Sequence, residues 1–171
     1  SRKNTLIRNK LISEKQLTIV FFFNLSEFIT SSLITSELVG DKSAQPVTEV
    51  CLGCICQAIS GCKQGLTCEG DTCGLFRITW AYWSDAGKPT INNLPTMNNL
   101  APEIPDCVVD PYCAAQTVQG YMRRFGQDCN GDGQVNCYDH MAIHKKGGYG
   151  CSGDLPFEYV NVFNQCINIV F

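Results

Sequence analysis

The stretch of sequence that decides the fold, residues 54–83, reads CICQAISGCKQGLTCEGDTCGLFRITWAYW. Its first twenty positions hold five of the 12 cysteines in a chain of 171 residues, and none precedes residue 51. An even number of cysteines crowded into one region indicates a disulfide framework, although spacing alone leaves the pairing open. We therefore predict six disulfides among Cys51, Cys54, Cys56, Cys62, Cys68, Cys73, Cys107, Cys113, Cys129, Cys137, Cys151 and Cys166.

Zinc binding is the alternative use for these thiols. Cys51, Cys54 and Cys56 have plausible ligand spacing, but no second C-x-x-C pair or histidine pair completes a tetrahedral site. The sequence therefore favours disulfides. Because disulfides persist in oxidising compartments, it also predicts a secreted protein.

Charge divides the chain into two parts. Residues 1–46 hold six Lys/Arg and four Asp/Glu, a net of +2, whereas residues 47–171 hold seven and twelve, a net of −5. An acidic folded region argues against nucleic acid as a partner. It also gives no general attraction to anionic bacterial surfaces, so any binding to them must come from a local site.

The N-terminal part has the order of a secretory signal. Five basic residues precede position 16, and the apolar run LTIVFFF follows at residues 17–23. Asn24 and Glu27 interrupt this run, which is too short and too polar for a transmembrane helix of about 20 apolar residues. We predict a signal-like or disordered leader over residues 1–46, a folded domain over residues 47–171 and no membrane span.

The clearest helix is predicted over residues 110–126. Asp110 fits the N-cap, Pro111 the first helical position and Gly126 the C-terminal cap, and apolar residues recur on one face. Further helices are expected as one or two turns within residues 51–63, over residues 136–147 and from about residue 156.

A strand is predicted in the first half of the segment CGLFRITWAYW. Phe76, Ile78, Trp80 and Tyr82 alternate along it, as apolar residues do in a half-buried strand. Four prolines and several asparagines predict a long irregular loop over residues 86–106. The sum is an α+β fold, mostly helical, in a small disulfide-rich domain.

Several motifs together resemble the invertebrate-type lysozymes, the destabilase family. They are CLGCIC, SGC, CGLFRITWAYWSDAG, DPYCAAQTVQGYM and AIHKKGGYGC, and the resemblance covers roughly residues 48–168. It implies a lysozyme-like fold with a cleft for bacterial peptidoglycan, in a monomer that requires no cofactor. The implied reaction is hydrolysis between N-acetylmuramic acid and N-acetylglucosamine, in antibacterial defence or digestion. Some family members are also credited with isopeptidase activity.

The catalytic pair of such a glycosidase is incomplete in this sequence. Glycoside hydrolysis generally needs one carboxyl group as the acid and a second that attacks or stabilises the sugar cation. The resemblance places the acid directly before the SGC tripeptide, where this chain has Ile59. We therefore predict weakened or lost muramidase activity, with peptidoglycan binding without catalysis, or isopeptidase activity, as the alternatives.

The second carboxylate is matched by Asp71, three residues after Cys68. Cys73 follows only two residues later, where the family usually has a longer loop, so the shortened loop can aim Asp71 away from the cleft. Glu69 is a weaker substitute. The alternative interpretation of Asp71 is a turn residue in EGDTC.

Ser60 and His144 are the candidate nucleophile and base for the isopeptidase alternative. A serine directly before Gly61 more often makes a cap or turn hydrogen bond, and a histidine is more often satisfied by nearby backbone. His140 and His144 share a helix face at i, i+4, but a metal site there lacks a third ligand.

Trp80, Tyr82 and Trp83 are candidates for stacking on sugar rings in the cleft. Their aromatic rings could equally belong to the core. We expect at least one of the three to face the cleft.

A calcium loop is predicted within DCNGDGQVNCYD, residues 128–139. Gly133 at position 6 allows the sharp turn that brings oxygen ligands together. Calcium here would be structural, and the alternative is an Asn/Gly-rich turn before the next helix. The ligands expected at positions 1, 3, 5, 7 and 12 are Asp128, Asn130, Asp132, the Gln134 carbonyl and Asp139.

Overall fold

The computed structural model describes residues 45–65, 68–93 and 106–170. All of them lie within residues 45–171, one of two units into which the chain divides. Most of the leader predicted over residues 1–46 lies outside the described residues, so the leader and the domain boundary at residue 47 stay predictions. Much of the irregular loop predicted over residues 86–106 lies outside them too.

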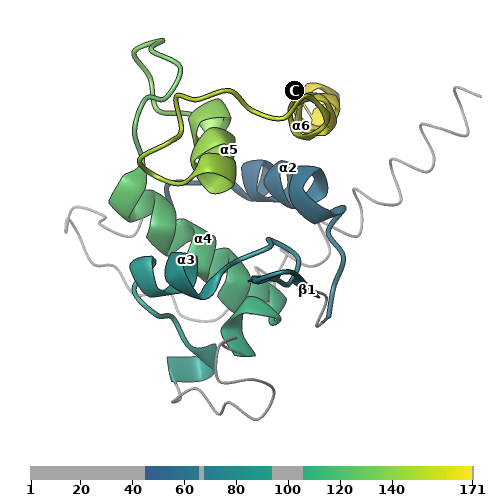
Figure 1. Cartoon of the computed structure of the whole chain (residues 1–171), viewed down its shortest axis with the longest axis vertical. Helices are drawn as coiled ribbons and strands as arrows, with labels where there is room; N and C mark the ends of the chain where they lie inside the picture. The colour runs from purple at the N-terminus through teal and green to yellow at the C-terminus, as the bar shows by residue number, and fades with distance from the viewer. Residues whose placement is uncertain (1–44, 66–67, 94–105, 171) are drawn as a thin grey trace, which may run out of the picture. The chain divides into compact units, whose positions relative to one another are not determined.

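The described elements are helices, apart from one short hairpin (Figure 1). Helices α2 and α6 pack extensively against each other, and α4 packs against α3, α5 and the short helix η3. In chain order the elements are α2 (Glu49–Ser60), β1 (Cys68–Glu69), β2 (Thr72–Cys73), α3 (Trp80–Asp85), η2 (Ile91–Asn93), η3 (Asp106–Val108), α4 (Pro111–Phe125), α5 (Cys137–Lys146) and α6 (Phe157–Val170).

Helix α2 has a threonine as its N-cap and a glycine as its C-cap. The Thr48 side chain accepts a hydrogen bond from the Cys51 amide, and Gly61 closes the helix in the left-handed conformation that glycine adopts most easily. Residues 51–56 are all buried. The helix expected within residues 51–63 is therefore confirmed, and it is longer than the one or two turns predicted.

Helix α4 confirms the prediction over residues 110–126, with the Asp110 side chain as N-cap and Gly126 as C-cap. The predicted apolar face is buried from Cys113 to Met122. Gln119, also buried, anchors the segment before α2, because its amide accepts from the Val47 N–H at 3.0 Å and donates to the Val47 carbonyl at 2.6 Å.

All twelve cysteines are paired, so the six predicted disulfides are confirmed. Two of them hold α2 to the C-terminal half of the domain, at α5 and at α6. The pairs are Cys51–Cys137, Cys54–Cys166, Cys56–Cys62, Cys68–Cys73, Cys107–Cys113 and Cys129–Cys151.

The strand predicted in the first half of residues 73–83 is wrong beyond Cys73, the last residue of β2. Residues 74–77 form a turn, Ile78 makes a single antiparallel bridge to Cys73, and α3 begins directly afterwards with the Thr79 side chain as its N-cap. Gly74 has a φ of 72°, and a Cβ there would lie 1.9 Å from the Val108 carbonyl oxygen. Backbone reversal at this close approach, which only glycine permits, ends the hairpin and excludes a continuing strand.

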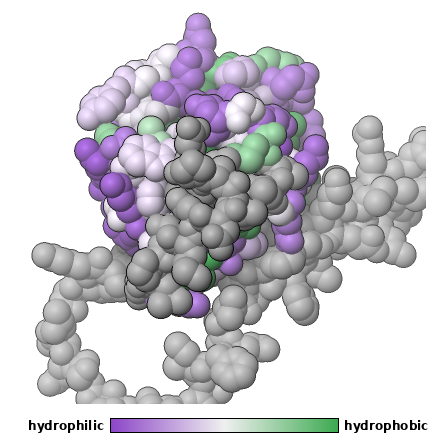
Figure 2. Space-filling model, turned by 60° about the horizontal axis from the view of Figure 1, so that its bottom comes forward, coloured by the Kyte–Doolittle hydropathy of each residue, from purple (hydrophilic) through white to green (hydrophobic). Residues whose placement is uncertain are grey.

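Within the described ranges, the two strands of the hairpin form the only sheet. The α+β, mostly helical fold class is therefore confirmed. Figure 2 shows one face of the molecule, on which hydrophilic residues predominate among the coloured ones. Among the helices that are described, none is both long and apolar enough to cross a membrane.

Candidate functional site

Ile59 lies in the last turn of α2 and is half-buried. A hydrogen bond and a disulfide fix the end of the helix around it. The hydroxyl of Ser60 donates to the Leu75 carbonyl at 2.5 Å, and the Cys56–Cys62 disulfide closes the end of the helix. The position that the family resemblance gives to the general acid is therefore fixed by backbone contacts, but its side chain is aliphatic and carries no proton to transfer.

Asp71 lies in the tight turn of the hairpin. Glu69 pairs with Thr72, so Gly70 and Asp71 form a two-residue loop, and Gly70 has a φ of 63°. Asp71 is exposed, and it makes no hydrogen bond or ion pair with the rest of the described chain. The geometry is that of a turn residue, and nothing in it fixes this carboxylate for chemistry.

Glu69 is held by an ion pair. Its Oε1 lies 2.7 Å from the Arg77 guanidinium, whose side chain is only 7% exposed, whereas the side chain of Glu69 is 73% exposed. A buried guanidinium requires anionic or hydrogen-bonding partners, and Glu69 supplies one of them. The contact joins the hairpin to the turn that precedes α3, and gives Glu69 a structural role that the sequence did not predict.

The structure does not join Ser60 and His144 as a nucleophile and its base. The Ser60 hydroxyl donates to backbone carbonyls. Both ring nitrogens of His144 are engaged elsewhere, Nε2 with the Phe76 carbonyl at 2.8 Å and Nδ1 with the Tyr82 hydroxyl at 3.0 Å. Because a carbonyl only accepts, Nε2 carries the hydrogen and Tyr82 donates to Nδ1.

Burial keeps His144 in its neutral form. It lowers the pKa of His144 to about 4; the hydrogen bond to the Phe76 carbonyl opposes this shift, and the charge of Lys145 adds to it. Burial likewise raises the pKa of Tyr82 well above its ordinary value. Tyr82 also stacks on Tyr121, with ring centroids 3.7 Å apart. The interpretation of His144 as a histidine satisfied by backbone fits this geometry, which also leaves it no nitrogen for a metal shared with His140.

Of the three aromatic candidates for sugar stacking, only Trp80 offers an open ring. It is 50% exposed, with the Lys88 ammonium 5.6 Å from the ring centroid. Trp83 is buried and donates its indole N–H to the Pro89 carbonyl at 2.8 Å. Tyr82 belongs to the interior network described above. The stacking prediction therefore stays open for Trp80 alone.

The loop predicted to bind calcium is closed by its own hydrogen bonds. Asp128 accepts from the amides of Gly131 and Gly133 at 2.7 and 2.8 Å. Hydrogen bonds from Gln134 and Asn130 lower the pKa of Asp132, which is fully exposed. No group of three or more His, Cys, Asp or Glu arranged to hold a metal is present in the described ranges.

Asp139, expected as the last calcium ligand, caps the start of helix α5. It is fully buried, and its two carboxylate oxygens accept from the amides of Cys129 and Asn136, each at 2.8 Å. Asn136 in turn caps the first turn of α5, so the two side chains form a reciprocal capping box. The spacing Asn-x-x-Asp before a helix carries this signal in the sequence, and the calcium interpretation overlooked it.

Comparison with known proteins places this disulfide-rich domain in one class. The family model described as Destabilase matches residues 48–166. Invertebrate-type lysozyme 3 of Caenorhabditis elegans is 32% identical over 120 residues, which are 68% of this chain and 84% of that protein. A lysozyme of Magallana gigas is 32% identical over 125 residues, 70% of this chain and 80% of that one.

Solved structures of lysozymes are similar to this domain as well. The complex of Aeromonas hydrophila PliI with Meretrix lusoria lysozyme matches with a TM-score of 0.55 and 28% identity, over 72% of this chain and 93% of that chain. Tapes japonica lysozyme matches with a TM-score of 0.51 and 27% identity, over 72% and 91%. The domain is thus of the lysozyme-like class expected from the sequence. The chain belongs to the destabilase family, that of the invertebrate-type lysozymes.

Proposed function

We propose that this protein is a secreted peptidoglycan-binding member of the lysozyme family whose muramidase activity is weak or absent. The observation that carries the proposal is Ile59 at the end of α2. Loss of a general acid slows such reactions by about 10² to 10⁴, or about 3–5 kcal/mol of activation free energy. The role would be antibacterial defence or digestion, carried out by a monomer.

The two candidate carboxylates, Glu69 and Asp71, give little support for a replacement acid. Glu69 is paired with Arg77, and Asp71 lies exposed in a two-residue turn. A general acid for glycoside hydrolysis needs an apolar environment that keeps it protonated near neutral pH, and an exposed turn does not supply one. Glycan binding does not need such an acid, and Trp80 offers an exposed ring for it.

Isopeptidase activity is the weaker candidate. It would need His144 to receive the proton of Ser60, yet both of its nitrogens are occupied and burial lowers its pKa to about 4. A base with so low a pKa accepts a proton poorly. We therefore assign Ser60 and His144 to the structure of the domain.

Calcium binding by residues 128–139 remains a separate proposal and takes no part in the reaction. Its support is the ligand spacing, and the buried, fully hydrogen-bonded Asp139 weighs against it. Calorimetric titration decides the matter. Heat at about millimolar calcium together with a raised melting temperature supports a site, and the absence of both removes it.

The function is tested by turbidity assays on bacterial cell walls with the wild-type protein, Ile59→Glu and the matched control Ile59→Gln. Glutamine has the shape of glutamate without its acidity. We expect the wild type and Ile59→Gln to pellet with insoluble peptidoglycan without clearing it, and Ile59→Glu to clear it faster. Clearing by the wild type at ordinary lysozyme rates would refute the proposal.

A further inference from the structure

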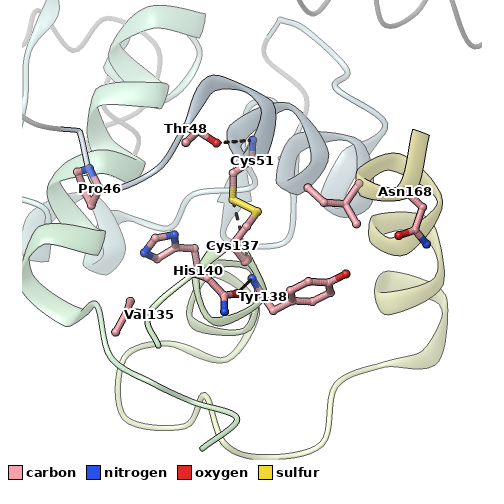
Figure 3. A pocket seen from close by; sticks show the side chains of 10 residues that line it. Pro46, Thr48, Cys51, Val135, Cys137, Tyr138, His140 and Asn168 are labelled. Atoms are coloured by element: carbon pink, nitrogen blue, oxygen red, sulfur yellow. Dashed lines mark hydrogen bonds between the residues drawn. A yellow bond between two sulfur atoms is a disulfide. The ribbon is translucent and has the colours of Figure 1, made fainter. Parts of the chain in front are cut away.

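A cavity open to solvent lies away from Ile59, the hairpin and the candidate aromatic residues. Its volume is about 550 Å³, and it is lined by the N-terminal ends of α2 and α5 and the C-terminal part of α6 (Figure 3). None of Ile59, Asp71 and Trp80 lines it. A volume of this size falls within the range of pockets that hold small molecules.

The walls of this cavity are mainly apolar. Pro46, Val135, Tyr138 and Ile167 line it, together with the Cys51–Cys137 disulfide. Val135 and Tyr138 are 52% and 46% exposed, so apolar surface remains open to a ligand at this place. No lysine, arginine, aspartate or glutamate is among the lining residues, which leaves no charge there to pair with an ionic ligand.

One polar side chain in the cavity has no protein partner. His140 is only 5% exposed, and its imidazole makes no hydrogen bond to any residue in the described part of the chain. Figure 3 shows the ring directed from α5 toward the space between Pro46 and Val135. The ring nitrogens are not among the fully buried polar atoms that lack a partner, so solvent reaches them, and a ligand group that hydrogen-bonds to the ring would take the place of that water.

The imidazole is suited to a neutral partner. Burial lowers the pKa of His140, and the opposing effect of Asp139 is smaller. A neutral ring has one donor nitrogen and one acceptor nitrogen, so it can receive a hydroxyl or N–H group. The buried Asp139 next to it disfavours an anion. The ring of Tyr138, edge-on against Phe163 with centroids 5.6 Å apart, points to the other side of the cavity, toward α6, so Pro46 and Val135 are the apolar groups beside the imidazole (Figure 3).

We propose that this cavity binds a small uncharged aromatic molecule whose single hydroxyl or N–H group hydrogen-bonds to His140. The apolar walls would cover the ring of the ligand, and the imidazole would fix its orientation. The site is independent of the glycan site, because none of its lining residues belongs to that site.

The test is an NMR titration of the full, disulfide-intact chain with indole, and with indene as the probe of the same shape that lacks the N–H group. Indole should bind with a Kd on the order of 1 mM and shift the His140 ring signals. Indene should bind roughly five- to tenfold more weakly, because it cannot make the hydrogen bond.

Two variants and one control make the test specific. Val135→Trp, at an exposed position, should fill the cavity and weaken indole binding at least about tenfold. His140→Phe should remove the difference between indole and indene. Tyr149→Ala, which changes an exposed aromatic residue outside the cavity, should bind indole as the wild type does.

The proposal is overturned if about 10 mM indole, tenfold above the expected Kd, leaves the signals of the lining residues unshifted. Equal indole binding by Val135→Trp and the wild type also overturns it. A difference between indole and indene that persists in His140→Phe refutes the hydrogen bond. If His140→Phe does not fold, the Val135→Trp comparison still decides, because that residue is half-exposed and its replacement leaves the core intact.

Discussion

Acidification should destabilise this domain through His144. The pKa of His144 is about 4 in the folded protein and 6.5 when exposed, so between these values the unfolded chain binds more protons. The stability due to neutral His144 is therefore complete above about pH 6.5 and is lost as the pH falls toward 4. At 1.36 kcal/mol per pKa unit, the free energy of unfolding drops by about 3 kcal/mol across this window.

The main cause of the lowered pKa is burial of the ring, which penalises the charged imidazolium, whereas the hydrogen bond to the Phe76 carbonyl acts in the opposite direction. A second proton on Nδ1 would remove the acceptor that the Tyr82 hydroxyl uses at 3.0 Å, in an environment that penalises charge. Lys145, next in the chain, adds to the penalty. The variant His144→Gln removes the titration while its amide keeps one donor and one acceptor.

Urea denaturation of disulfide-intact protein at about pH 7.5 and 4.5 measures the effect, since the change between these two pH values covers most of the range over which the stability is lost. The wild type should lose about 2–3 kcal/mol more than His144→Gln between them. His140→Gln is the matched comparison for the second histidine, because the pKa of His140 is lowered too and this variant leaves His144 in place. Equal losses in the wild type and His144→Gln would show that protonation of His144 does not destabilise the domain.

Three further predictions concern the Asp139 cap of α5, the Cys54–Cys166 disulfide and the exposed ring of Trp80. Asp139→Ala should cost about 2–4 kcal/mol in urea denaturation in EDTA, without calcium, because two amides lose their acceptor. Absence of this loss in EDTA would contradict the capping role. Replacing Cys54 and Cys166 together by alanine removes a link across 112 residues and should cost about 4–5 kcal/mol; no change in denaturation midpoint would contradict this. Trp80→Ala should weaken pelleting with peptidoglycan several-fold, whereas Tyr149→Ala should not; equal pelleting by both would exclude Trp80 from the glycan site.

The helices could be predicted because their ends are marked locally. Asp110 and Pro111 start α4, Asn136 starts α5, and glycines follow both helices. The strand predicted in the first half of residues 73–83 could not be excluded in this way, because Phe76 and Ile78 are both buried but in a turn and a bridge. That turn depends on contact with Val108, some 30 residues away, which no local pattern reveals.

At the candidate site, too, some features could be predicted from the sequence and others could not. The absence of a proton donor at Ile59 can be read from the sequence alone, because it depends only on residue identity. The orientation of Asp71 and the engagement of Glu69 depend on the two-residue turn and on Arg77 eight positions later. The hydrogen bonds of His144 involve partners more than 60 residues distant. Such tertiary contacts decide which polar residues remain available for chemistry.

Whether Ile59 leaves the domain without a proton donor can be measured by the release of reducing ends from purified peptidoglycan, for the wild-type protein and for Ile59→Glu at equal amounts of bound protein. We expect the wild type to release them at least about 10²-fold more slowly than Ile59→Glu. Release by the wild type that equals or exceeds release by Ile59→Glu would mean that another group donates the proton and that the loss of activity proposed for this protein is wrong.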